Sequence, residues 1–352
     1  MLTKTKGYIM NSTTQEVYVG ADLHSSNIVL SLTDNAGTEI IKKKVKTNIT
    51  DIDKVLSPFK SQIKVIGVES TFNWYWFVDG LVDLGYNVKL GNPAKMKQYT
   101  GIKVTNDYTD ARWLAEQLRL NIFPECYIYP KELRSVRDAL RCRQLHVRRK
   151  TQTFLSFNGL LARYGYTETK AKDALKDWTL DDIENVFQDH FLCQELWVLI
   201  ESTRFTGEQI KCLENLVRKF IKSTWQYKRI QQLPGIGDIL GMTIVLETGD
   251  FNRFKSAGCY ASYCRTVKSI RTSNDKKKGQ NNRKNGNKYL AYAFMEAANF
   301  AVMHYPQVQS WYDRKKKRTN NIVARKALAS KLSKAAWHVM KGEDFDMKMM
   351  FG

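Results

Sequence analysis

Residues 130–228 form a long run with helical spacing of apolar residues and one proline, Pro130, at its start. Because proline breaks helices and glycine weakens them, a run so poor in both predicts long continuous helices. The stretches "LRSVRDALRCRQLHVRRKTQTFLSFNGLLARYG" and "TGEQIKCLENLVRKFIKSTW" carry the pattern. We therefore expect an extended helical hairpin or coiled-coil-like arm over 127–228, with a separate domain on either side.

The residues before this arm alternate between strand and helix patterns. Strands are predicted by the apolar, β-branched stretches within 16–33, 37–47 and 63–70 and by "YNVKLGN", and helices near 51–59, in "WYWFVDGLVDLG" and from about Thr105. Three strands followed by alternating helices and strands are typical of an α/β domain with a mixed sheet. We assign this domain to 16–126, after an N-terminal extension, 1–15.

The residues after the arm predict a mainly helical domain over 229–345, followed by a short tail, 346–352. The domain begins with "LPGIGDILGMTIVLETGDF" and ends with the helix "KYLAYAFMEAANFAVMH" and a basic patch, "DRKKKRTNN". Between them lies the polar stretch "RTVKSIRTSNDKKKGQNNRKNGN". Its composition also fits a low-complexity linker, but its place between two helical segments favours a functional loop.

Charge is distributed unevenly along the chain, whose net charge is +21. Residues 16–126 contain 13 basic and 13 acidic residues, whereas 127–352 contain 41 basic and 22 acidic residues. Such an excess predicts a polyanionic partner, most simply nucleic acid, because basic side chains neutralise phosphates and release counterions. No apolar run is long enough for a membrane span, and the six scattered cysteines have no zinc-finger spacing, so we expect a cytoplasmic protein without membrane contact or bound zinc.

Four acidic residues stand where an α/β fold brings elements together. Asp22 and Glu69 end predicted strands, and Asp107 and Asp110 lie one helical turn apart. Two carboxylates at 4 Å repel by about 4 kcal/mol at an effective dielectric near 20, so a cluster of four must take up protons or hold cations. Oxygen ligands favour Mg²⁺ or Mn²⁺. The alternative is that Asp107 and Asp110 only complement the helix dipole.

Several stretches resemble a known family. "VGADLHSSNIVLSL", "IGVEST" and "GNPAKMKQYTG…NDYTDARWLAEQL" are similar to the RuvC-like DEDD domain of the bacterial insertion-sequence 110 transposases. "LPGIG", "ETGDFNRF", "YASYCR" and "KNGNKYL" resemble the C-terminal transposase domain of the same family, so the resemblance extends from residue 16 to about 340. It implies an RNase H/RuvC-like fold in which Asp22, Glu69, Asp107 and Asp110 hold the four DEDD positions.

The resemblance also implies a serine nucleophile that forms a 5′-phosphoserine link to DNA. The matching residue is Ser273 in "RTSNDKKKG", with Ser269 as the alternative. Where the family commonly has glycine two places after the serine, this chain has Asp275. Asn274 and Asp275 tolerate a left-handed turn, although a carboxylate beside phosphate is unfavourable.

Residues around this serine predict phosphate binding. The candidates are Arg271, Lys276, Lys277, Lys278, Arg283, Lys284 and Lys288, together with Gly235 and Gly237 of "LPGIG". That motif resembles a helix-hairpin-helix turn whose amides approach phosphate, although a plain interhelical turn is an equal reading. The family resemblance further implies donor and target DNA, a structured guide RNA, and a homo-oligomer, a dimer that becomes a tetramer in synapsis.

Two other functions remain open from the residues alone. In a hydrolytic RuvC-like nuclease or junction resolvase the four acids activate water and no serine is needed. In a non-catalytic nucleic-acid-binding protein the acids only cap helices and strands. His24, two residues after Asp22, could line the metal site, but we expect a structural role for it. For Tyr292, Phe294, Trp311 and Tyr312 we expect core positions rather than base stacking.

Overall fold

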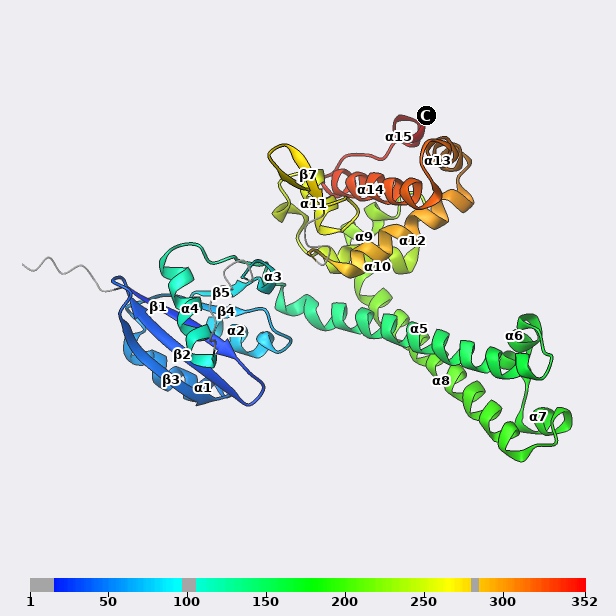
Figure 1. Cartoon of the computed structure of the whole chain (residues 1–352), viewed down its shortest axis with the longest axis horizontal. Helices are drawn as coiled ribbons and strands as arrows, with labels where there is room; N and C mark the ends of the chain where they lie inside the picture. Colours follow the sequence, from blue (N-terminus) through cyan, green and yellow to red (C-terminus); the bar gives the residue numbers. More distant parts are fainter. Residues whose placement is uncertain (1–15, 97–105, 280–284) are drawn as a thin grey trace, which may run out of the picture. The chain divides into compact units, whose positions relative to one another are not determined.

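The computed structural model describes residues 16–96, 106–279 and 285–352. The chain forms two compact units, Met1–Tyr129 and Pro130–Gly352 (Figure 1). The second unit holds both the helical arm and the C-terminal helices. No helix among the described residues is both long and apolar enough to cross a bilayer.

A five-stranded mixed sheet forms the centre of the first unit, which confirms the predicted α/β character. Its strands are β1 (Val17–Leu23), β2 (Asn27–Asp34), β3 (Glu39–Lys46), β4 (Ile63–Glu69) and β5 (Val88–Gly91), in the order β3-β2-β1-β4-β5. The β1–β2 and β2–β3 pairs are antiparallel, and the β1–β4 and β4–β5 pairs are parallel. The edge strand β3 is mostly exposed, because lysines occupy half of its positions.

Helices cover both faces of this sheet. On one face, α1 (Ile49–Leu56) and α2 (Trp74–Asp83) pack on the odd-numbered residues of β1 and the even-numbered residues of β2, in a core that includes Phe77 and Leu30. On the other face lies α4 (Asp107–Arg119), which packs on Tyr18 and Val65. Short helical turns, η1 (Ser57–Phe59) and α3 (Pro93–Met96), complete the unit.

The contact between α4 and β1 depends on Gly20. A β-carbon at this position would lie 1.9 Å from the carbonyl oxygen of Ala111 and 2.6 Å from the amide nitrogen of Ala115. Both neighbours belong to the backbone of α4, so they cannot move aside as a side chain does. Glycine therefore lets this helix lie directly on β1, the strand that carries Asp22.

The helical arm of the second unit is an antiparallel hairpin. Its two long helices are α5 (Lys131–Arg163) and α8 (His190–Ile221), joined at the tip by α6 (Glu168–Asp177) and α7 (Leu180–Val186) (Figure 1). Phe157 of α5 packs near Leu196 of α8, whereas Leu140 packs near Val217, which gives the antiparallel direction. The two long helices, α5 and α8, confirm the prediction made from the scarcity of proline and glycine in this part of the chain.

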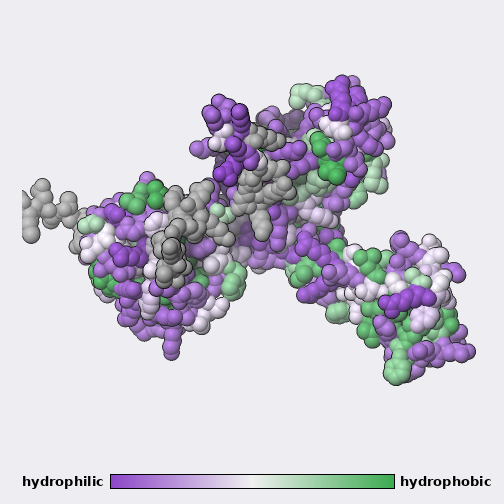
Figure 2. All heavy atoms as spheres, in the orientation of Figure 1, coloured by the Kyte–Doolittle hydropathy of each residue, from purple (hydrophilic) through white to green (hydrophobic). Residues whose placement is uncertain are grey.

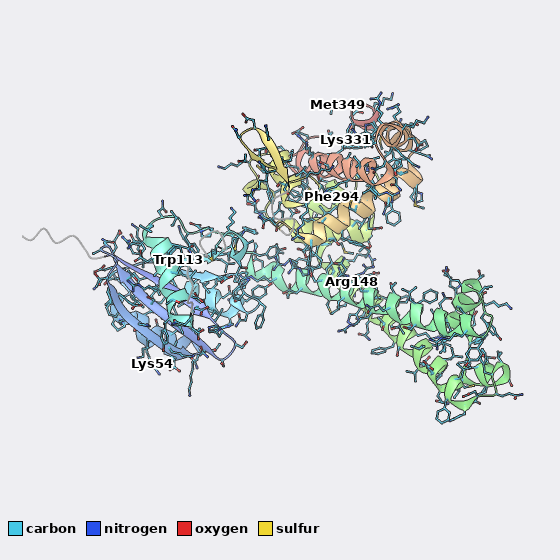
Figure 3. All side chains as sticks on the ribbon, in the orientation of Figure 1. Lys54, Trp113, Arg148, Phe294, Lys331 and Met349 are labelled. Carbon is cyan, nitrogen blue, oxygen red and sulfur yellow. The ribbon has the colours of Figure 1, made fainter. Side chains whose placement is uncertain are left out.

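The C-terminal part is mainly helical and encloses the largest core. Its elements are α9 (Trp225–Ile230), α10 (Asp238–Thr248), η3 (Phe251–Arg253), α11 (Ala257–Tyr263), β6 (Arg271–Ser273), β7 (Lys276–Gly279), α12 (Lys288–His304), α13 (Pro306–Arg318), α14 (Asn321–Met340) and α15 (Met347–Phe351). Phe294 of α12 lies fully buried among these helices (Figure 3). Strands β6 and β7 pair in antiparallel fashion, so part of the predicted basic loop is a β-hairpin.

A buried ion pair joins the arm to this core. Glu247 of α10, which is 3% exposed, accepts hydrogen bonds from Nε (2.6 Å) and an Nη (2.8 Å) of Arg141 on α5. It also accepts one from Asn287, the residue that caps α12 (2.7 Å). Because one carboxylate binds groups from α5 and from the start of α12, it sets the position of both helices relative to α10.

Replacing Gly20 with alanine tests the close contact between α4 and β1. We expect Gly20→Ala to lower the free energy of unfolding by about 2 to 3 kcal/mol, since the added methyl meets backbone atoms that cannot yield. The matched control is Gly159→Ala within α5, where a β-carbon would meet nothing within 4 Å. That variant should be neutral or gain up to about 1 kcal/mol. Urea denaturation measures both, and equal effects would contradict the packing argument.

Candidate metal centre and basic hairpin

Asp22 and Glu69 lie at the carboxyl ends of adjacent parallel strands. Ala21 of β1 pairs with Val68 of β4, so the next residue on each strand, Asp22 and Glu69, projects to the opposite face of the sheet. This is the face that carries Gly20 and α4. The register therefore places both acids at the same edge of the sheet and on the same face.

The start of α4 brings Asp107 and Asp110 to that edge. The helix is capped by Asn106, whose side chain accepts hydrogen bonds from the amides of Tyr108 and Thr109. The amide of Asn106 in turn donates to the hydroxyl oxygen of Thr109. The hydrogen-bonded cap is thus provided by other residues. The carboxylates of Asp107 and Asp110 stand in the first turn without serving as the cap, although their charge also suits the helix dipole.

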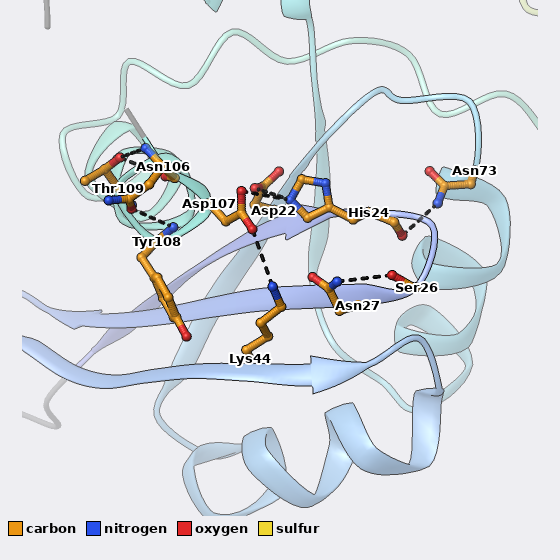
Figure 4. Close-up of polar contacts among 10 residues, drawn as sticks. All are labelled: Asp22, His24, Ser26, Asn27, Lys44, Asn73, Asn106, Asp107, Tyr108 and Thr109. Carbon is orange, nitrogen blue, oxygen red and sulfur yellow. Dashed lines mark hydrogen bonds and ion pairs between the residues drawn. The ribbon is translucent and has the colours of Figure 1, made fainter. Parts of the chain in front are cut away.

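Asp22 and Asp107 meet around His24. Nε2 of His24 lies 2.9 Å from Oδ2 of Asp22 and 3.5 Å from Oδ1 of Asp107 (Figure 4). One ligand atom from each of these three residues lies within 4.8 Å of the others. The backbone of His24 is held in turn by Asn73, whose side-chain amide donates to its carbonyl oxygen (3.1 Å).

Burial and neighbouring carboxylates raise the pKa of two of these acids, Asp22 and Asp110. Burial raises the pKa of Asp22, and the carboxylates of Asp110 and Asp107 add to this effect, while His24 opposes it. Burial likewise raises the pKa of Asp110, with a further contribution from Asp107. The ammonium of Lys44 on β3 lies 3.6 Å from Oδ2 of Asp107 and offsets part of the negative charge. Three of the four predicted acids therefore share one electrostatic environment.

The cluster has the donor set of a divalent cation site. Nε2 of His24 is buried and faces a carboxylate oxygen of Asp22 and one of Asp107, so the three ligand atoms lie around one point. Two carboxylates and an imidazole nitrogen within 4.8 Å of one another fit a cation such as Mn²⁺ or Mg²⁺. Glu69 is not one of the three clustered residues; its strand register places it beside them.

Two residues outside the four predicted acids also lie at this site. His24, for which we expect a structural role, stands between Asp22 and Asp107, and Lys44 is not a candidate from sequence at all. The position of His24 two residues after a strand-end aspartate is a usable signal. Nothing in the run of lysines "KKKVK" distinguishes Lys44, because its contact with Asp107 arises from the pairing of β2 with β3.

Ser273 ends β6, in a two-residue hairpin rather than an irregular loop. The turn residues Asn274 and Asp275 have φ of 50° and 56°, the left-handed values that a type I′ hairpin needs and that both residues tolerate. Ser273 is exposed and pairs with Lys276 across the hairpin. The hairpin projects as a hydrophilic surface (Figure 2).

Most of the predicted basic side chains of this region are exposed. Arg271, Lys276, Lys278 and Lys288 are all open to solvent. Arg283 and Lys284 lie outside the described residues, and Lys277 is placed only as part of β7. The four acids belong to the first unit and Ser273 to the second.

The "LPGIG" turn has a packing role. Gly235 has φ of 77°, and a β-carbon there would lie 2.1 Å from the carbonyl oxygen of Ala297 on α12. Gly237 is the N-cap of α10, and the next residue, Asp238, pairs with Arg218 at 2.5 Å. A carboxylate already stands at this helix start, which favours the interhelical-turn reading over phosphate binding.

A groove of about 590 Å³ lies beside this turn within the second unit. Its lining includes Tyr292, Phe300 and Tyr305, three partly exposed aromatic residues. Phe294 and Tyr312, in contrast, are 0% and 5% exposed and belong to the core, as expected. Tyr292 is thus the exception among the aromatic residues that we assign to the core.

Two family models match this chain. One, described as the transposase of the IS116/IS110/IS902 family, matches 227–313, and the other, a DEDD transposase of the IS110 type, matches 19–165. The chain belongs to the IS110 family of transposases. The second match includes all four acids and His24, and the first includes Ser273. Family membership implies DNA transposition and suggests the use of a divalent metal.

Two relatives extend the similarity over nearly the whole chain. A protein of Sinorhizobium fredii named as transposase y4pF/y4sB is 24% identical over 348 residues, which cover 95% of this chain and 87% of the relative. The transposase for insertion sequence element IS1328 of Yersinia enterocolitica is 20% identical over 338 residues, covering 91% and 96%. The similarity therefore includes the helical arm, which lies largely between the two matched family models.

Replacing Asp22 with asparagine tests the metal centre. Because burial raises the pKa of Asp22, the folded chain keeps this proton to higher pH than the unfolded chain, and stability falls as pH rises through the folded pKa. We therefore expect Asp22→Asn to raise the melting temperature of the metal-free protein at pH 7 and to lose this advantage toward pH 4.

The change in stability on adding a divalent cation distinguishes a metal-binding cluster from a cluster of acids that only repel one another. At a concentration one hundred times its Kd, Mg²⁺ or Mn²⁺ should stabilise the wild-type chain by about 2.7 kcal/mol, and Asp22→Asn much less. The control is Asp51→Asn on α1, a half-buried residue paired with Lys54 away from the cluster, which should keep the full response. Equal stabilisation of all three proteins in a thermal melt would contradict the assignment.

Proposed function

We propose that the chain is a DNA recombinase that cleaves and exchanges strands through a 5′-phosphoserine intermediate, with the acids of the first unit holding Mg²⁺ or Mn²⁺. The observation that carries the proposal is the meeting of Asp22, Asp107 and His24 within 4.8 Å in a chain of the IS110 transposase family. The mixed sheet, with strand-end acids facing a helix that begins with two more, supports a RuvC-like assignment.

Ser273 is the proposed nucleophile. Its Oγ forms a bond to the DNA phosphorus, the bond from phosphorus to the 3′-oxygen breaks, and that oxygen takes up a proton as it leaves. The serine proton passes to a carboxylate of the acidic set, for which Asp110 with its raised pKa is suited. Exchange of strands then reverses the step, with a new 3′-oxygen displacing the serine. A bound divalent cation would stabilise charge on the phosphate and on the leaving oxygen.

The hairpin around Ser273 supports this role. Lys276 stands opposite the serine, and Arg271 and Lys278 are exposed on the same hairpin, so cations surround the hydroxyl. Such groups can bind the scissile phosphate and offset the charge that develops on it. Asp275 forms part of the turn itself, where its left-handed φ of 56° meets a backbone requirement.

We further propose a homo-oligomer in which the acids of one protomer meet the serine of another. Acids and serine belong to different compact units, so a shared site requires the two units to be brought together, within one chain or between chains. The arm exposes large apolar side chains, among them Leu155, Val198 and Phe205, each about 60% exposed, and hydrophobic surface is visible along it (Figure 2). Exposed apolar surface of this kind favours protein–protein contact.

The family resemblance leads us to propose a structured guide RNA that pairs with donor and target DNA. In that arrangement base pairing selects the sequence, and the protein binds backbones. The charge of residues 127–352, with 41 basic and 22 acidic residues, is sufficient to serve both RNA and DNA.

Trapping the covalent intermediate tests the proposal. Denaturation of reactions with wild-type protein, Mg²⁺, guide RNA and donor and target DNA should yield protein-linked DNA, and mass spectrometry should place the link on Ser273. Ser273→Ala should lower linkage and strand transfer by about 10³-fold or more. Ser269→Ala serves as the control and should keep both.

Other outcomes identify the alternatives. Cleavage retained by Ser273→Ala, without a protein link, indicates a hydrolytic nuclease. A link on Ser269 moves the nucleophile. If Asp22→Asn and wild type both bind DNA yet neither breaks it with Mg²⁺, the chain is a non-catalytic nucleic-acid-binding protein.

A further inference from the structure

We infer that Lys42, Lys44 and Lys46, on one face of the edge strand β3, form a DNA-phosphate track that leads to the acidic cluster. The inference rests on the proposed function, because it concerns how substrate reaches that same site. These three residues are called the lysine track below. They are exposed and occupy alternate positions of the strand.

Strand register places the lysine track on the face that carries the metal centre. Lys44 pairs with Val29, which pairs with Asp22, so these three residues form one row across β3, β2 and β1. Lys42 pairs with Ser31, which pairs with Gly20, so the next row leads to the strand residue under α4. Because directly paired residues share a face, the lysines lie on the same side as Asp22.

Contacts with α4 agree with this placement. The ammonium of Lys44 lies 3.6 Å from Oδ2 of Asp107 (Figure 4). The ammonium of Lys42 lies 4.6 Å from the ring centre of Tyr108. Both partners belong to the first turn of the helix that contributes Asp107 and Asp110. The lysine track thus borders the acidic cluster directly.

The spacing suits a phosphate backbone. Alternate residues of a strand are roughly 6.8 Å apart, so three lysines span about 14 Å, close to four nucleotides of rise along one strand of duplex DNA. Flexible ammonium groups adapt to such a chain of phosphates without a fixed geometry. The fourth lysine of β3, Lys43, faces the other side of the sheet, since it pairs with Leu30 of the apolar core face.

Lys44 acts as a positioning residue in this scheme. Without substrate the ammonium of Lys44 neutralises the carboxylate of Asp107. When DNA binds, the ammonium leaves this carboxylate and contacts a backbone phosphate beside the cluster. The carboxylate of Asp107 is thereby released toward a cation. Protection of an exposed sheet edge, a common use of lysine, requires no such orientation and would apply equally to Lys43.

The test compares Lys44 with Lys43, two neighbouring, exposed lysines on opposite faces of one strand. Affinity of the full chain for a four-way DNA junction is measured against salt concentration in EDTA, so that no cleavage intervenes. Lys44→Ala should reduce the slope of log K against log salt by about 0.9, as expected for one phosphate contact, and Lys44→Arg should restore it. Replacing all three lysines of the track should reduce the slope by about 2.7. Lys43→Ala should leave the slope unchanged.

Each other outcome overturns the inference. Equal slopes for Lys43→Ala and Lys44→Ala show that the lysine track does not bind DNA. The same conclusion follows if the slope falls with RNA of the same sequence but not with DNA. Failure of Lys44→Arg to restore the slope shows that the charge is not what acts. The proposed recombinase chemistry fails separately, through absence of the Ser273 link in the wild-type protein.

Discussion

The close contact between α4 and β1 at Gly20 determines the geometry of the first unit. Since a β-carbon would lie 1.9 Å from a backbone oxygen of α4, only glycine allows the helix to reach the strand. The first turn of α4 then stands beside the end of β1, and Asp107 approaches Asp22 and His24. Without this contact Asp107 and Asp110 would not stand beside Asp22.

The closeness of these acids changes their electrostatic properties. Burial and mutual repulsion raise the pKa of Asp22 and Asp110, which is an unfavourable arrangement for an empty carboxylate cluster. His24 and Lys44 relieve part of it. A divalent cation would relieve the remaining repulsion, and the DEDD transposase family suggests the use of such a metal.

The division of the chain into two units separates the acids from the serine. The first unit presents carboxylates at a sheet edge, and the second presents a hydroxyl on a hairpin of cations. In the proposed mechanism the first unit supplies the metal-binding acids and the second supplies the nucleophile. Cleavage by that route would therefore require the acids and the serine to be brought together.

Much of the fold could be predicted from local patterns. The helix Lys288–His304 begins and ends at the residues expected from its apolar spacing, and the five strands of the first unit appear where β-branched residues cluster. The hairpin around Ser273 is harder to predict from the sequence, because its strands are only three and four residues long and contain mostly polar side chains. Such a hairpin is specified by its turn residues rather than by a hydrophobic period.

The order of the elements, the uneven distribution of charge and the four candidate acids can all be read from the chain, because each is a local property of the sequence. Which of these groups meet depends on the tertiary packing. The contacts of His24 with Asp107 and of Lys44 with Asp107 join residues more than sixty positions apart, through strand register and helix docking. No local pattern encodes such contacts, since they depend on how close the backbones can approach.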